Sequence, residues 1–187
     1  MTSFRTSLKA LLCTGALLAS AHVRADQDDP RLEELFRKLQ AATDVAEAIP
    51  TEDLIWQIWI EHDDASIQNQ MLRGIEQTNA GDLQGALATY DRLVAAAPDF
   101  AEAWNKRATI HWLLGNHEAS EADIVKVLQL EPFHFGALSG RGLVLLSQGR
   151  FAEARSAFSR ALEVHPNMPS VRANLEEITR YLNSKTI

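Results

Sequence analysis

A period of 34 residues in the positions of glycine and proline constrains this chain more than any other feature. Three glycines and three prolines share this spacing: Gly81, Gly115, Gly149, Pro98, Pro132 and Pro166. Each glycine follows an apolar helical stretch at a point where the chain must turn, and each proline ends a second helical stretch. The pattern predicts three helix–turn–helix units, each of which buries its apolar face by stacking on a neighbour.

The spacing resembles that of the tetratricopeptide repeat family, with repeats at residues 67–100, 101–134 and 135–168. The family has a small residue at the eighth place, where two helices touch, and this chain has Gly74, Ala108 and Gly142. Sixteen residues later the family has a large apolar residue, and this chain has Tyr90, Ile124 and Phe158. The resemblance implies an all-α fold, a right-handed superhelical solenoid of antiparallel helix pairs with a concave groove.

Helical patterns continue beyond the three repeats at both ends. Residues 30–66 are predicted to form a degenerate helical hairpin, in which Asp29 caps the first helix and Pro50 opens the second. Trp56 and Trp59 in this hairpin are expected to pack in the core rather than to form an exposed docking patch. Residues 169–183 are predicted to form a C-terminal capping helix with a polar outer face.

The first 25 residues have the composition of a secretory signal peptide. Arg5 and Lys9 precede an apolar stretch over residues 10–21, which is shorter than the ~20 residues that a membrane span needs. A cut after Ala25, or the alternative cut after Ala21, would remove the only cysteine and leave a periplasmic or secreted chain. Residues 104–142 are also similar to short, signal-bearing tetratricopeptide proteins of proteobacteria, and this resemblance implies a Gram-negative periplasm without implying an activity.

The charge balance of the mature chain disfavours two classes of partner. Residues 1–25 contain three of the 18 basic residues and none of the 25 acidic ones, so the remainder carries 15 bases against 25 acids, a net charge of −10. Nucleic acids and anionic lipid surfaces are bound mainly through basic faces. We therefore expect a protein or peptide partner, no nucleic acid and no stable membrane insertion after signal cleavage.

In the tetratricopeptide repeat family the concave groove typically receives an extended or helical peptide. Carrying the family's groove positions over gives the candidate peptide-binding residues Met71, Ile75, Asn105, Thr109, Trp112 and Ser139, with Val144 beside them. Trp112 is the candidate anchor, because tryptophan is enriched at binding hot spots; packing against the next repeat is an equal alternative.

Some members of the family grip the terminal carboxylate of chaperone tails with lysine and asparagine. The corresponding positions here hold Met71, Ile75, Lys106, Gly136 and Gly140, of which only Lys106 has a suitable charge. The sequence therefore disfavours that mode of binding.

The residues that could carry chemistry show no catalytic or metal-binding spacing. No two histidines have the spacing of an HExxH motif, and residues 61–64 (EHDD) are explained more simply as a solvated helix end than as a cation site. Arg107, one of three periodic arginines, is expected to bridge the helices of its hairpin by pairing with Asp123. We therefore expect no enzyme activity and no cofactor.

These observations predict an exported scaffold that binds a partner protein in its groove, within an envelope complex. One alternative is a structural solenoid that associates with itself into a homo-oligomer. The other alternative is a ligand-binding, metal-binding or enzymatic protein that uses the fold as a support. The absence of catalytic and metal-binding motifs from the sequence disfavours it.

Overall fold

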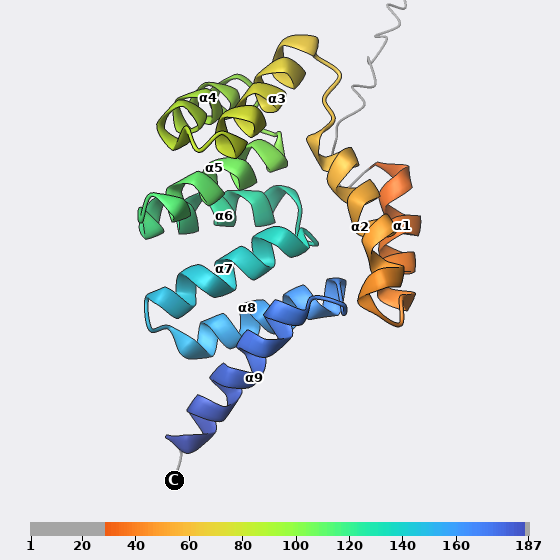
Figure 1. Ribbon diagram of the computed structural model, residues 1–187, viewed down its shortest axis with the longest axis vertical. Coiled ribbons are helices and arrows are strands. Elements are labelled where there is room, and N and C mark those ends of the chain that lie inside the picture. The colour runs from red at the N-terminus through yellow and green to blue at the C-terminus, as the bar shows by residue number, and fades with distance from the viewer. Residues whose placement is uncertain (1–28, 186–187) are drawn as a thin grey trace, which may run out of the picture.

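The computed structural model describes residues 29–185 of the chain, and the signal peptide predicted at residues 1–25 lies outside them. The described part is all helical (Figure 1). Its nine helices are α1 (Pro30–Ala41), α2 (Val45–Ile60), α3 (Ala65–Asn79), α4 (Leu83–Ala96), α5 (Ala101–Leu113), α6 (His117–Leu130), α7 (Phe135–Ser147), α8 (Phe151–Val164) and α9 (Pro169–Ser184). None of these nine is long and apolar enough to cross a bilayer.

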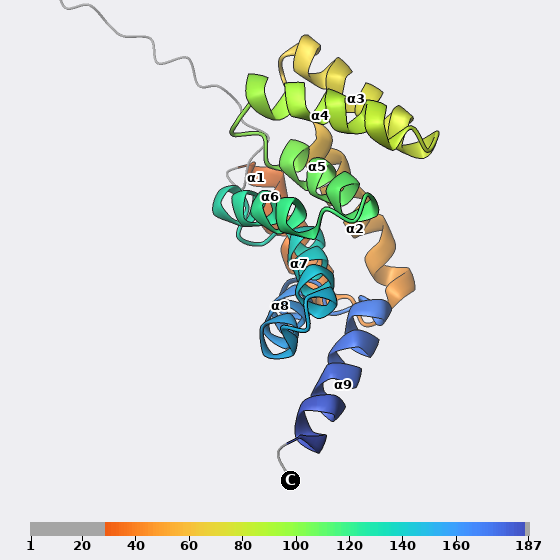
Figure 2. The same cartoon turned by 90° about the vertical axis from the view of Figure 1, so that its left-hand side faces the viewer.

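Helices α3 to α8 form three antiparallel pairs that stack in chain order (Figure 2). The turn inside each pair contains one of the periodic glycines, Gly81, Gly115 or Gly149, with φ of 77°, 77° and 73°. A residue with a β-carbon is strained in this left-handed conformation, so the turn requires glycine. This is the physical reason for the glycine period in the sequence.

Two of the pairs are held together by an aromatic ring placed over a glycine. A β-carbon on Gly74 would lie 2.6 Å from the ring of Tyr90, and one on Gly142 would overlap the ring of Phe158. Both rings are fully buried. The helices can therefore approach this closely only because both glycines lack a side chain.

The middle pair, α5 and α6, is joined in a different way. Its eighth residue is Ala108, and the residue that packs on this side of α6 is Ile124 in place of an aromatic ring. Ser120 stands where the first and third repeats have Ala86 and Ala154. It is buried, and its Oγ donates a hydrogen bond of 2.8 Å to the carbonyl oxygen of Ala108. The polar substitution is therefore satisfied inside the pair.

The predicted pairing of Arg107 with Asp123 is confirmed. Arg107 Nε and Nη2 donate to the two carboxylate oxygens of Asp123 at 2.8 and 2.7 Å, which is a bidentate geometry. Its Nη1 donates to Asp91 on α4 at 2.9 Å, and its guanidinium lies 4.8 Å from the ring centre of Trp104. Arg107 thus joins α5 to both α4 and α6.

The second helix of the N-terminal hairpin begins five residues earlier than predicted, at Val45 rather than at Pro50. Asp44 caps it by accepting a hydrogen bond from the backbone N–H of Glu47, and Glu47 in turn accepts from the backbone N–H and the hydroxyl of Thr43. The bonds resemble a capping box, except that Glu47 bonds Thr43, the residue before the N-cap, and they fix the start of the helix. Pro50 consequently lies within the helix and does not open it.

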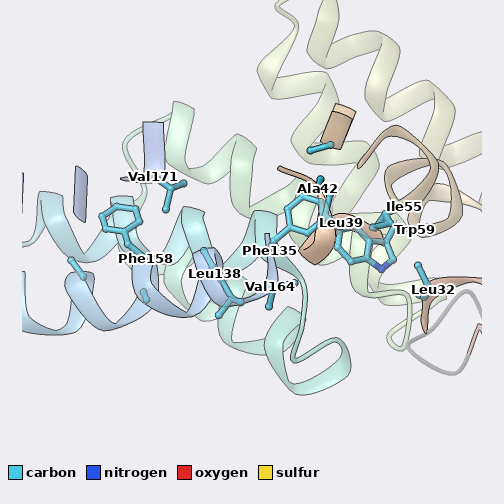
Figure 3. Packing of buried hydrophobic residues seen from close by; sticks show 14 of the residues in the cluster. Leu32, Leu39, Ala42, Ile55, Trp59, Phe135, Leu138, Phe158, Val164 and Val171 are labelled. Atoms are coloured by element: carbon cyan, nitrogen blue, oxygen red, sulfur yellow. The ribbon is translucent and has the colours of Figure 1, made fainter. Parts of the chain in front are cut away.

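The hairpin lies beside the three pairs and does not stack on α3 as a further repeat would (Figure 1). Its main contacts outside itself are with α5 and α8. Figure 3 shows Trp59 next to Phe135 of α7, within a core cluster that extends from Leu32 on α1 to Val171 on α9. Trp59 is buried and Trp56 is half-buried, as expected of core residues.

Helix α9 packs against α8 at the other end of the chain. Val171 and Ile178 are buried on the side that faces the core, whereas Arg172 and Glu176 are exposed. The helix thus covers the apolar face of the third pair and presents a polar face to solvent.

Two glycines on α7 allow a matched test of the close contact between Gly142 and the ring of Phe158. Gly142→Ala should lower the free energy of unfolding by about 1–3 kcal/mol, because the new β-carbon overlaps Phe158. Gly140→Ala should raise it by about 0.5–1 kcal/mol, because there the β-carbon meets only Ile124 at 3.8 Å and alanine favours the helix. Urea denaturation followed by circular dichroism measures both, and an unchanged midpoint for Gly142→Ala would contradict the close contact.

Candidate functional site

A cavity of about 230 Å³ opens between α5, α6 and α7. It is lined by eleven residues from these three helices, none of which is ionisable: Asn105, Ala108, Thr109, Trp112, Ser120, Ile124, Gly136, Ser139, Gly140, Leu143 and Val144. We call it the α5–α7 pocket. Small residues form much of it, and Thr109 and Leu143 are exposed at its rim.

Four of the six candidate peptide-binding residues lie together in this pocket. Asn105, Thr109 and Trp112 come from α5, where their spacing of three and four residues puts them on one helix face. Ser139 faces them from α7. The groove positions of the second and third repeats therefore do converge on one cavity.

The other two candidates, both on α3, do not line the pocket. Met71 is fully buried in the core of the first pair, so its selection as a groove residue was wrong. It lies on the same stripe of α3 as Ile67 and Gly74, and this stripe packs onto α4. Ile75 is half-buried against the same core.

The structure also shows lining residues that were not selected from the sequence. Leu143 is 38% exposed at the rim of the pocket, whereas its neighbour Val144, which was predicted beside the groove, is 1% exposed. Leu143 directly follows Gly142, just as Thr109 directly follows Ala108, so Leu143 and Thr109 occupy the same place in their repeats. Counting that place consistently in both repeats would have identified Leu143 instead of Val144.

The polar side chains of the pocket direct their hydrogen-bond donors into the protein. The hydroxyls of Thr109, Ser120 and Ser139 each donate to a backbone carbonyl oxygen, at 3.0, 2.8 and 2.9 Å. The amide Nδ2 of Asn105 donates to Glu102 Oε2 at 2.9 Å. These four donors are therefore already paired within the protein.

Beside the pocket lies a buried ionic cluster centred on Glu102. His134 Nε2 lies 2.8 Å from Glu102 Oε2, and Lys106 Nζ lies 3.0 Å from Oε1. His134 Nδ1 accepts a hydrogen bond from the backbone N–H of Ala137, so the proton of its neutral form lies on Nε2, which donates to Glu102. Burial raises the pKa of Glu102, but Lys106 and His134 outweigh this effect and hold the pKa below its usual value of 4.5.

The N-terminal hairpin covers this cluster. Trp59 stacks on His134 with ring centres 3.9 Å apart and an interplanar angle of 11°. The Lys106 ammonium lies 5.5 Å from the ring centre of Trp56, and the same ring fills the space that a β-carbon on Gly136 would need. Helix α2 therefore covers the N-terminal ends of α5 and α7.

The contacts of α2 continue to the turn after α8. His165 Nε2 lies 3.2 Å from Glu52 Oε2, and Asn167 Nδ2 donates to the carbonyl oxygen of Ala42 at 2.7 Å. The hairpin is thus held to both the second and the third repeat.

The acidic segment at residues 61–64 connects α2 to α3. Asp64 caps α3 by accepting from the backbone N–H groups of Ser66 and Ile67, and His62 Nδ1 accepts from the backbone N–H of Asp64. Across residues 29–185 no group of three or more His, Cys, Asp and Glu side chains is placed to hold a metal ion.

A second depression, of about 510 Å³, lies between α1 and the turn before α7. Phe36 and Phe133 line it together with charged residues of α1. None of the candidate residues selected from the sequence contributes to it.

Comparison with known proteins identifies the fold and the family. Models of the tetratricopeptide repeat match residues 71–129 and 135–168. A protein of Rhizobium etli described as TPR repeat-containing is 35% identical over 136 residues, which cover 73% of this chain and 67% of that protein. The chain belongs to the tetratricopeptide repeat family. Human DnaJ homolog subfamily C member 3 is 32% identical over 103 residues, but these are only 20% of its length.

Solved structures agree with this assignment. The first TPR domain of Spaghetti (RPAP3), bound to an HSP90 peptide, has a TM-score of 0.62 at 22% identity and covers 65% of this chain and 96% of that one. The TPR domain of P58(IPK) has a TM-score of 0.62 at 26% identity, covering 65% of this chain and 35% of that one. Both share the helical solenoid, and the first shows that a domain of this fold holds a peptide.

The Glu102 cluster should make stability depend on pH. Because its pKa is lower in the folded chain than in the unfolded one, ionised Glu102 stabilises the fold above pH ~4.5, and this contribution is lost as pH falls toward the folded pKa. Glu102→Gln should be less stable near neutral pH and lose less stability on acidification. Urea denaturation of both proteins between about pH 3 and pH 7 measures this, and parallel curves would contradict it.

Proposed function

We propose that this protein is an exported scaffold that receives a segment of a partner protein in its groove, at the α5–α7 pocket. The observation that carries the proposal is the pocket itself, an open cavity of about 230 Å³ on the groove between two repeats. Solved relatives of the fold support this role, because the RPAP3 domain and the TPR2B domain of yeast Sti1 were each determined with a chaperone peptide. The scaffold contributes shape and position, and no bond is made or broken.

The partner of this chain differs from the chaperone tails bound by those relatives. Met71 is buried, and Gly136 lies under Trp56. Lys106, the one cation at the positions that grip a terminal carboxylate in the family, faces Glu102 and Trp56. A carboxylate approaching the groove would have to compete with Glu102 for this ammonium. We therefore propose recognition through the interior of a segment rather than through its C-terminus.

Export to the periplasm is part of the same proposal. It rests on the basic head and apolar stretch of residues 1–25 and on the acidic, cysteine-free remainder of the chain. A scaffold of this kind would organise a complex in the cell envelope. Self-association of the solenoid is the second candidate, and the mass of the mature chain in solution distinguishes it.

Affinity capture from an envelope extract tests the groove directly. The bait is the mature chain, compared with a Trp112→Ala, Leu143→Ala double variant that removes two apolar groups from the pocket. A Val125→Ala variant is the control, because Val125 is 39% exposed on α6 and lies outside the pocket. All three baits should first give matching helical circular dichroism spectra.

We expect a partner that the wild type and Val125→Ala retain and the double variant loses. A partner retained equally by all three would place the binding site elsewhere on the surface. If no partner is retained and the mature chain has the mass of a dimer or larger assembly, self-association replaces the proposal.

A further inference from the structure

Gly140, on α7, is the one glycine within residues 29–185 that no internal contact or turn requires. Three of the others adopt a positive φ: Gly81, Gly115 and Gly149. A β-carbon on any of four more would collide with a neighbouring side chain: Gly74, Gly85, Gly136 and Gly142. On Gly140 it would meet only Ile124 Cδ1, at the ordinary distance of 3.8 Å. Glycine inside a helix destabilises it relative to alanine, so the structure gains nothing internally from this residue.

The visible consequence of Gly140 is an open pocket wall. Gly140 lines the α5–α7 pocket, and its β-carbon would lie beside Ile124, another lining residue, so a larger side chain there would take up space in the cavity. Glycine is the residue that allows a ligand to approach a helix backbone closely. The missing side chain therefore points to an occupant of the pocket.

The chemistry of the wall selects the kind of occupant. No lining residue is ionisable, so a charged group in the pocket would lose water without gaining a partner. The hydroxyls of Thr109, Ser120 and Ser139 already donate to backbone carbonyls. Ile124, Leu143 and Trp112 supply the apolar contacts. An uncharged apolar group fits this environment.

The volume of the cavity limits the size of the group that it can hold. An apolar cavity of roughly 150 Å³ is large enough to bind benzene. The α5–α7 pocket, at about 230 Å³, therefore accommodates a side chain from leucine to phenylalanine in size. Because its rim residues Thr109 and Leu143 are exposed, such a side chain can enter from a segment lying along the groove.

We propose that the α5–α7 pocket is a specificity site for one uncharged apolar side chain of the partner protein, and that Gly140 sets its depth. The proposal rests on the function proposed above and adds the chemistry of recognition to it. It predicts that partners share an apolar anchor within a segment and need neither a charged anchor nor a free C-terminus.

The experiment uses the whole mature chain and a random library of displayed peptides of about twelve residues. Peptides enriched on the wild type are synthesised with a fluorophore, and their dissociation constants are measured by fluorescence anisotropy. The dissociation constants of the same peptides are also measured with Gly140→Ala and Gly140→Leu. Peptides in which the shared residue is replaced by alanine are then measured with the wild type and with Gly140→Leu. Gly140→Leu fills the pocket while its β-carbon is tolerated, so a folded protein with unchanged circular dichroism is expected.

The expected result is a set of peptides that share a leucine, isoleucine, methionine or phenylalanine. Gly140→Leu should weaken their binding by roughly 10- to 100-fold, as the loss of one buried apolar side chain would, and Gly140→Ala should weaken it less. Replacing the anchor by alanine should weaken binding to the wild type by a similar factor and have little further effect in Gly140→Leu.

Three results would overturn the proposal. Equal affinity for the wild type and Gly140→Leu would remove the pocket from recognition while leaving the scaffold function intact. A shared charged residue or a required free carboxylate would show a different chemistry of recognition. The absence of any enriched peptide would also reject the apolar anchor, and the scaffold function would then stand or fall by the capture experiment.

Discussion

The contact between the two helices of each repeat is the constraint on which the rest of the structure depends. In the first and third repeats a glycine meets an aromatic ring, Gly74 with Tyr90 and Gly142 with Phe158, so no space is left between the helices. The second repeat has Ala108 on one side and the slimmer Ile124 on the other, and both line the α5–α7 pocket. The pocket thus lies where the repeat departs from the glycine–aromatic pairing of its neighbours.

The N-terminal hairpin covers one end of helices α5 and α7. Its two tryptophans pack on His134, Gly136 and Lys106, so the charged groups at the N-terminal ends of α5 and α7 face α2 instead of a ligand. What remains open is the neutral pocket further along the same helices. The hairpin therefore engages Lys106, the one suitably placed cation, without lining the pocket.

The repeat was predictable from the sequence because glycine at a left-handed turn and proline after a helix are local requirements, each readable from a few residues. The pairing of Arg107 with Asp123 followed from the same register. The position of the hairpin was not predictable, because Trp59 contacts His134, 75 positions further along the chain, and no local pattern encodes that contact. Met71 was misplaced because a groove position and a core position are adjacent on one helix, and only the packing of α3 on α4 decides between them.

The proposed function requires that the partner binds at the pocket between α5 and α7. A photo-crosslinking amino acid placed at Leu143 or at Val125 tests it most directly, because the two native side chains are 38% and 39% exposed but lie on different helices, one at the pocket rim and one outside it. Irradiation of cells that produce either variant should give a crosslinked partner from position 143 and none from position 125. Crosslinks from position 125 alone would place the partner on α6, outside the pocket, and reject binding at the pocket.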